Sequence, residues 1–144
     1  MLSKTCEYGI RASIFIAQAT KEGNRVSIPE IAAGIDAPEQ FIAKILHNLT
    51  RQGLLQSMKG PTGGFFFNEK SLKQSLADIV IAIDGDKLFT GCGLGLDYCS
   101  EKKPCPIHHQ FKKIREECFD MLHSAKLGAI RDELEHKVAF LKQR

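Results

Sequence analysis

Three of the five cysteines in this 144-residue chain fall within fourteen residues, at Cys92, Cys99 and Cys105. They lie in a segment rich in glycine and proline, residues 91–108, that shows neither the helical nor the strand period of apolar residues. Loops longer than about 12 residues without secondary structure of their own are uncommon unless they are functional or disordered. Thiolates that converge on a metal would order this segment, which we call the cysteine loop.

The cysteines indicate metal or redox chemistry rather than disulfides, because their number is odd and no leader sequence is visible. Iron suits this arrangement of thiolates, and Cys105-Pro106 is similar to the Cys-Pro end of some ferredoxin motifs. Zinc also accepts three cysteines and a histidine, although structural zinc sites usually have tighter cysteine pairs. A metal-free thiol sensor is the third interpretation.

The elements that precede the loop begin with a helix over residues 1–19, capped by Ser3 or Thr5 and burying Cys6 as an apolar residue. Glu7 and Arg11 have the i,i+4 spacing of an exposed ion pair.

A helix-turn-helix follows the opening helix. Ser27 caps a second helix that has Pro29 in its first turn and ends at Gly34. After a short turn, Pro38 starts a third helix that runs to Gly53. Its predicted buried positions are Phe41, Ile42, Ile45, Leu46 and Leu49.

A small β-hairpin comes directly after these helices. Residues 54–58 and 65–67 are predicted strands, and Lys59 to Gly64 form a glycine-rich turn between them. A helix-turn-helix with such a wing is a winged-helix domain, so the predicted partner is double-stranded DNA. Five basic residues and one acidic residue between Gln40 and Lys73 agree with phosphate binding. The predicted DNA-binding residues are Ser27, Pro38, Glu39, Gln40, Lys44, Asn48, Arg51, Lys59, Gly60, Thr62 and Gly63.

The second half of the chain is predicted to be helical around the cysteine loop. Ser75 caps a helix over residues 76–84 that Gly85 terminates. After the loop, the a/d spacing of a two-helix seam predicts a dimerisation helix, which breaks at residues 126–128. Its seam residues are Ile107, Phe111, Ile114, Cys118, Met121 and Ala125. A last amphipathic helix folds back through Ile130, Leu134, Val138 and Leu141.

The fold class is therefore mainly α with a small β wing: a winged helix-turn-helix domain (residues 1–86), a cysteine-rich cluster-binding loop (87–105), and a long dimerisation helix with a C-terminal helix (106–144).

In four stretches the chain resembles the bacterial Rrf-type regulators, the family of the iron–sulfur regulator IscR and the nitric-oxide-sensing repressor NsrR. The stretches are Glu7-Tyr8, the wing GLLQSMKGPTGGFF, the helix SLADIVIAID and the three-cysteine loop. The resemblance implies a homodimeric winged-helix repressor or activator, and many such proteins carry an iron–sulfur cluster that tunes DNA binding.

The resemblance also implies ligands. Cys92, Cys99 and Cys105 match the cluster cysteines, and His108 matches the fourth ligand of two-iron members. Glu7 matches an acidic residue that ligates a four-iron cluster from the other subunit in some members. The sequence departs from the IscR-like pattern by one extra residue between the first two cysteines, and by Ala43 where an acidic base-reading residue is expected.

We therefore expect a cytoplasmic, homodimeric transcription regulator of a palindromic operator. Its iron–sulfur cluster, with two or four irons, would sense nitrosative or oxidative stress or iron–sulfur status. A zinc-binding or metal-free thiol regulator is the alternative. A thiol redox enzyme that uses Cys105 with His108 or His109 needs a substrate that a DNA reader does not, so we expect no enzyme. No stretch approaches the roughly 20 apolar residues of a membrane span.

Overall fold

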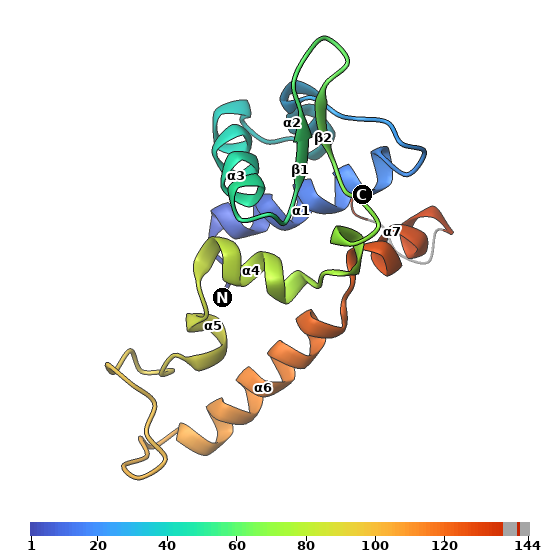
Figure 1. The fold of residues 1–144 in the computed structure, drawn as a ribbon. Coiled ribbons are helices and arrows are strands. Elements are labelled where there is room, and N and C mark those ends of the chain that lie inside the picture. Colours follow the sequence, from blue (N-terminus) through green and yellow to red (C-terminus); the bar gives the residue numbers. More distant parts are fainter. Residues whose placement is uncertain (137–140, 142–144) are drawn as a thin grey trace.

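Helix α1 (Lys4–Ala19) lies at the centre of the winged-helix body, and α2, α3, α4, α7 and the wing pack around it (Figure 1). The structure is a computed structural model that describes residues 1–136 and 141. The mainly helical chain with one small sheet confirms the predicted fold class. The remaining elements are α2 (Ile28–Ile35), α3 (Glu39–Arg51), β1 (Gln56–Met58), β2 (Gly64–Phe66), a 3-10 turn (Ser71–Lys73), α4 (Leu76–Asp84), α5 (Lys87–Thr90), α6 (His108–Ser124) and α7 (Leu127–Glu135).

The buried face of α1 consists largely of small side chains, and this lets its neighbours approach closely. A Cβ atom added to Gly9 would lie 2.2 Å from Cδ1 of Ile83 on α4. Ala12 is fully buried and Ala17 nearly so, within the main core. At the start of the helix the hydroxyl of Ser3 accepts a hydrogen bond from the N–H of Cys6 at 3.0 Å, so the cap is Ser3 and not Thr5.

The helix-turn-helix forms as predicted, with one difference at the turn. Ser27 caps α2 by accepting a hydrogen bond from the N–H of Glu30. Helix α2 does not end at Gly34; it ends at Ile35, and its C-cap residue Asp36 adopts the left-handed conformation with φ 54°. Gly34 instead provides room for a neighbour, because a Cβ there would lie 2.2 Å from Cε2 of Phe15.

The wing is a two-stranded antiparallel hairpin with Gln56 opposite Phe66 and Met58 opposite Gly64. The first strand is shorter than the predicted residues 54–58, whereas the second has the predicted length and begins one residue earlier, at Gly64. Val26, which precedes α2, forms an additional bridge to Phe65, with hydrogen bonds of 2.8 and 3.1 Å. Gly64 permits this approach, since it has φ 145° and a Cβ there would lie 2.6 Å from the carbonyl oxygen of Val26. The wing is thus anchored to the segment before the helix-turn-helix.

Helices α4 and α6 form a hairpin whose base is closed by backbone hydrogen bonds. The N–H of Leu76 donates to the carbonyl of Ala125 at 2.9 Å, and the N–H of Leu127 donates to the carbonyl of Gln74 at 3.1 Å. Ser75 and Asp78 form a reciprocal capping box at the start of α4, as the sequence indicates for Ser75.

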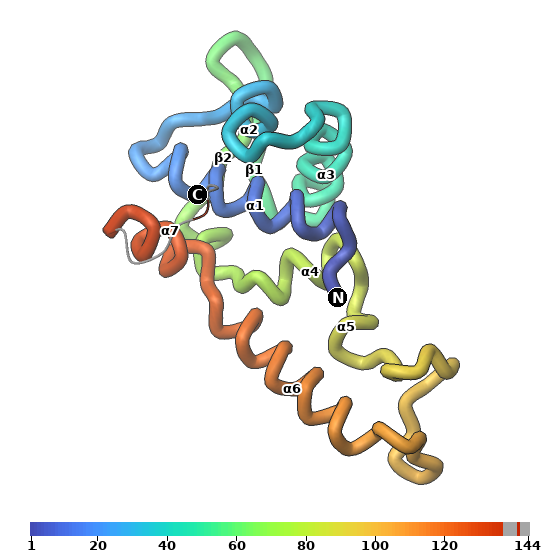
Figure 2. Tube along the Cα trace, turned by 180° about the vertical axis from the view of Figure 1, so that it is seen from behind, coloured from blue at the N-terminus to red at the C-terminus, as the bar shows by residue number. Residues whose placement is uncertain are grey.

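From this base, α6 runs away from the winged-helix body to the cysteine loop, which lies at the end of the molecule farthest from the wing (Figures 1 and 2). Helix α7 turns back and packs on α1, with Leu127 fully buried and Ile130 and Leu134 packed against the core. The predicted return of the C-terminal helix is confirmed for these residues. Val138 lies outside the described residues.

The predicted seam on α6 is wrong for part of its length. Cys118 packs into a second core cluster with Cys6, Val80 and Leu122, so it faces its own protomer. Ile114 and Met121 remain 58% and 59% exposed. The buried face of α6 follows Arg115, Cys118 and Leu122, because the spacing of 3 and 4 residues is equally helical there. Residues 87–90 form α5, which the sequence analysis did not predict.

Candidate functional sites: a DNA-reading surface and a cysteine loop

Helix α3 carries five of the eleven residues predicted to bind DNA. Glu39, Gln40, Lys44 and Arg51 are exposed, whereas Ile42, Ile45, Leu46 and Leu49 are buried in the core. Phe41, predicted to be buried, is 51% exposed and stands on this outer face. Helix α3 therefore presents amide, charged and aromatic groups to a ligand.

A groove between the starts of α2 and α3 extends this surface. It is lined by Ile28, Pro29, Pro38, Glu39, Gln40 and Ala43. Pro38 is the N-cap residue of α3 and makes no side-chain cap bond. The groove joins apolar side chains to the amide of Gln40, a combination that no sequence motif predicted.

Two of the predicted DNA-binding residues also have structural partners. The hydroxyl of Ser27 is used in its cap with Glu30. Asn48 is half-buried, and its Oδ1 accepts a hydrogen bond from Nε2 of Gln52 at 2.9 Å. The same Gln52 amide donates to the carbonyl of Ala82 and so connects α3 to α4.

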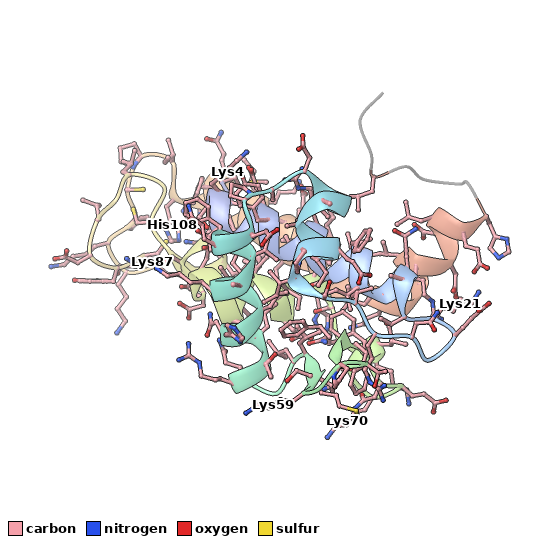
Figure 3. The ribbon with its side chains drawn as sticks, turned by 90° about the horizontal axis from the view of Figure 1, so that it is seen from above. Lys4, Lys21, Lys59, Lys70, Lys87 and His108 are labelled. Atoms are coloured by element: carbon pink, nitrogen blue, oxygen red, sulfur yellow. The ribbon has the colours of Figure 1, made fainter. Side chains whose placement is uncertain are left out.

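The tip of the wing is exposed from Ser57 to Thr62. Gly60 has φ 112°, and its carbonyl accepts a hydrogen bond from the N–H of Gly63 at 2.9 Å. Gly63 has no room for a side chain, since a Cβ would lie 2.1 Å from the carbonyl oxygen of Met58. Figure 3 shows Lys59, on the wing, well apart from His108, beside the cysteine loop.

The cysteine loop brings its predicted ligands together in two pairs. Sγ of Cys99 lies 3.2 Å from Nδ1 of His108, the first residue of α6. The Cys105 side chain lies close enough to Cys92 to help stabilise its thiolate. In residues 1–136 and 141, no group of three or more Cys, His, Asp or Glu side chains is close enough to hold one metal ion. The arrangement is two separate pairs and not one four-ligand cage.

The Cys92 thiol is activated by the backbone around it. The N–H groups of Leu94 and Leu96, and then the Cys105 side chain, stabilise its thiolate and lower the pKa of Cys92 below the ordinary thiol value. The N–H of Leu94 donates to Sγ of Cys92 at 3.4 Å.

His108 is buried, and one of its ring nitrogens makes no hydrogen bond among the described residues. Its ring is only 3% exposed, and Nε2 has no hydrogen-bond partner among the described residues. A buried polar nitrogen normally has a partner, so a free one marks a place that a ligand can satisfy.

Glu7 does not join the cysteines within this protomer. It forms an exposed ion pair with Lys4 at 3.4 Å. The predicted pair with Arg11 is wrong, because the Arg11 guanidinium lies 5.2 Å from the centre of the Tyr8 ring instead. Arg11 thus uses an aromatic partner that the charge spacing did not reveal.

Cys6 shows the opposite chemistry to Cys92. Burial, and next the charge of Asp84, raise the pKa of the Cys6 thiol to about 12. The side chain is fully buried, as predicted, and packs as an apolar group.

Arg115 is a residue that the sequence analysis missed. It is only 8% exposed, and its guanidinium donates to the carbonyls of Thr90 and Gly91, where α5 ends and the cysteine loop begins. Its position four residues after Phe111 places it near the apolar face of α6, but a charged side chain gives no apolar signal in the sequence.

A helix-turn-helix followed by a glycine-rich wing defines the winged-helix class of DNA-binding proteins, and here a helical hairpin joins it to a cysteine-rich loop. A family model described as "Rrf2: Iron-dependent Transcriptional regulator" matches residues 2–133. The chain belongs to this family, whose members are transcriptional regulators and not enzymes.

Relatives and solved structures agree with this family. A protein of Aquifex aeolicus named as an HTH-type transcriptional regulator is 30% identical over 122 residues, which are 83% of each chain. T. potens IscR has a similar fold, with a TM-score of 0.76 at 20% identity over 99% of this chain and 93% of that one. CymR, the global cysteine regulator of B. subtilis, has a similar fold, with a TM-score of 0.74 at 20% identity over 92% of this chain and 96% of that one.

No helix among the described residues is long and apolar enough to cross a bilayer.

We predict that the cysteines of reduced, metal-free protein react in a defined order with iodoacetamide. The lowered pKa of Cys92 gives it more thiolate at a given pH, so its labelling should begin at lower pH than that of an ordinary thiol. Cys6 should stay unlabelled while the protein is folded, since its thiol pKa is raised to about 12. Peptide mass spectrometry between about pH 6 and pH 9 measures both. Labelling of Cys6 before Cys92 would contradict the assignment, and Cys92→Ser is the control.

Proposed function

We propose that this protein is a homodimeric transcription regulator that binds a palindromic DNA operator, and that an iron–sulfur cluster at the cysteine loop sets its operator affinity. The observation that carries the proposal is the pairing of Cys92 with Cys105 and of Cys99 with His108, beside a buried histidine nitrogen that has no partner. A regulator of bacterial genes works in the cytoplasm. In this proposal residues 1–86 bind DNA, residues 87–105 hold the cluster, and residues 106–144 contain the dimerisation helix.

The α3 surface supplies the base contacts in this proposal. The amide of Gln40 suits the edge of an adenine, and Ala43 with Pro29 gives an apolar surface that fits a thymine methyl group. Lys44 and Asn48 add further polar groups, while Arg51 at the end of the helix contacts phosphate. Glu39 and Pro38 orient the start of α3 in the major groove.

The wing supplies phosphate affinity. Lys59 projects from a turn whose backbone amides at Gly60, Thr62 and Gly63 stand near the exposed tip. Such a tip approaches the sugar-phosphate backbone or the minor groove closely because its glycines have no side chains.

Replacing Lys59 with Ala should weaken binding to all DNA sequences alike and reduce the slope of log affinity against log salt by about one. Fluorescence anisotropy with a cognate and a scrambled operator measures this. Gln40→Ala is the contrasting variant, since it should reduce discrimination between the two by about 1–3 kcal/mol with the salt slope unchanged. A change in sequence preference for Lys59→Ala would show that the roles are wrongly assigned.

The dimer interface is the exposed apolar stripe on α6. Ile114 and Met121 are seven residues apart, so they lie on one side of the helix, and both are more than half exposed. An equivalent helix of a second copy would bury this stripe and place two α3 helices about a two-fold axis. Fewer than three heptads do not form a stable coiled coil alone, so the hairpin with α4 has to hold α6 in place.

Ile114→Asp should convert the dimer to monomers and weaken operator binding, because it buries like charges across the seam. Light scattering gives the mass. Lys113→Asp is the matched control, since Lys113 is an exposed neighbour on the same helix and should leave the dimer intact. An unchanged mass for Ile114→Asp would exclude this interface.

The donors of the cysteine loop fit an iron–sulfur cluster. Two pairs of donors match a two-iron cluster, in which each iron takes two protein ligands, and the Cys99–His108 contact favours His108 over Glu7 as the fourth ligand. When bound, such a cluster supplies iron–thiolate bonds that nitric oxide and oxidants attack. Cys92, Cys99, Cys105 and His108 would hold the cluster and so order the loop, whose ends are α5 and α6. A change in the order of the loop would reach the hairpin of α4 and α6, and through it the spacing of the two α3 helices.

Anaerobically purified protein should be brown and contain iron and sulfide, and His108→Ala should lose this colour while Glu7→Gln keeps it. Loaded protein and a Cys92→Ala, Cys99→Ala, Cys105→Ala variant should differ at least about tenfold in operator affinity at equal salt, which corresponds to about 1.4 kcal/mol. Colourless protein containing zinc would favour the zinc alternative. Equal affinities of two intact dimers would rule out the loop as the switch.

A metal-free thiol switch is the second candidate, and the contact between the Cys92 and Cys105 thiols favours it. Hydrogen peroxide would oxidise the two thiols to a disulfide and be reduced to two molecules of water. Peroxide-dependent DNA binding by protein without iron or zinc would distinguish this candidate.

A further inference from the structure

Arg115 is a buried cation whose hydrogen bonds, among the described residues, go only to carbonyl groups. Its side chain is 8% exposed, no carboxylate pairs with it there, and its Nε atom has no hydrogen-bond partner. Burying an arginine without an anion is costly, so the contacts that it makes instead have to compensate.

Those contacts lie at the start of the cysteine loop. Nη1 of Arg115 donates to the carbonyl of Thr90 at 3.1 Å and also to the carbonyl of Gly91. The carbonyl of Gly91 shares a rigid peptide plane with the amide nitrogen of Cys92. Arg115 therefore fixes the direction in which the chain enters Cys92.

Phe111 holds the other side of the same cysteine. Its ring packs so closely on Gly93 that a Cβ there would lie 2.8 Å from Cγ of the ring. The Arg115 guanidinium lies 5.6 Å from the centre of this ring, one helical turn away. Cys92 is thus bracketed by two residues of α6, through Gly91 on one side and Gly93 on the other.

The C-terminal end of the cysteine loop continues directly into the same helix. His108 is the first residue of α6, and its N–H donates to the carbonyl of Cys105 at 3.0 Å. Helix α6 is therefore joined to both ends of the cysteine loop. The C-terminal end runs directly into it, and the N-terminal end is held by Arg115 and Phe111.

We propose that Arg115 is the positioning residue of the cysteine site, which fixes Cys92 to α6 and keeps the loop formed when no metal is bound. This inference rests on the proposed metal-binding function for its purpose. The positioning itself is a property of the metal-free chain and is tested there.

The test is amide hydrogen exchange of full-length, reduced, metal-free protein, followed by mass spectrometry of the peptide that covers residues 91–96. Arg115→Gln should accelerate exchange in this peptide at least about tenfold, because the carbonyls of Thr90 and Gly91 lose their donor. Lys113→Gln removes the same charge from an exposed position of α6 and should leave the peptide unchanged. Amides of α1 should remain protected in both variants, which shows that the core stays folded.

Arg115→Lys supplies the second variant if Arg115→Gln also loses protection in α1. Lysine keeps the charge but not the planar fork, so it should give an intermediate acceleration in residues 91–96. Wild-type exchange rates in this peptide, for either folded variant, would overturn the proposal.

Reconstitution with ferrous iron and sulfide separates this inference from the proposed function. If the wild type takes up the cluster, Arg115→Gln should load it more slowly and Lys113→Gln at the wild-type rate. A wild type that takes up no iron would end the cluster proposal, while the exchange result would still decide the role of Arg115.

Discussion

The close packing of α1 against four other helices and the wing is the constraint on which the rest of the fold depends. Gly9 and Ala12 keep the helix narrow where α4 and α3 approach, and Gly34 does the same for α2 against Phe15. Interiors are packed as densely as crystals, so a larger side chain at these positions would push a whole element outward. Helix α3 and the α4–α6 hairpin are both positioned by this one helix.

The two functional surfaces are therefore connected through packed elements and lie far apart. Helix α4 contacts α1 and α3 within the winged-helix body, and it contacts α6, which leads to the cysteine loop. Gln52 adds a polar connection, since its amide bonds both Asn48 on α3 and the carbonyl of Ala82 on α4. A change at α6 meets the recognition helix after only one intervening element, and the side chains that carry it are mostly buried.

Local signals in the sequence predicted most of the elements because each has a chemical cause at its ends. Ser3, Ser27 and Ser75 cap helices, and Gly85 terminates one, through contacts that involve only near neighbours. The burial of Cys118 and Arg115 depended on which face of α6 meets α4. A pattern of 3 and 4 residues allows two adjacent faces, so sequence alone could not choose between them.

For the cysteine loop, the sequence predicts which residues could bind a metal but not how these residues are arranged. Spacing identified Cys92, Cys99 and Cys105, and the resemblance added His108 and Glu7. The pairing of Cys99 with His108 follows from the path of a long loop, which leaves no periodic signal. The bridge from Val26 to Phe65 was missed for a similar reason, because a single pair of hydrogen bonds needs no strand-like run of residues.

The closed base of the α4–α6 hairpin makes it a lever with a fixed pivot. Backbone hydrogen bonds join Leu76 to Ala125 and Leu127 to Gln74, so α6 can swing only about the end that lies nearest the winged-helix body. A helix of 17 residues is about 25 Å long, and a displacement of about 2 Å at its far end is a rotation of about 5°. Ile114 lies farther from the pivot than Met121, so the same rotation moves it more. A small rotation of α6 would therefore displace the exposed apolar stripe unevenly, most at Ile114 and least at Met121.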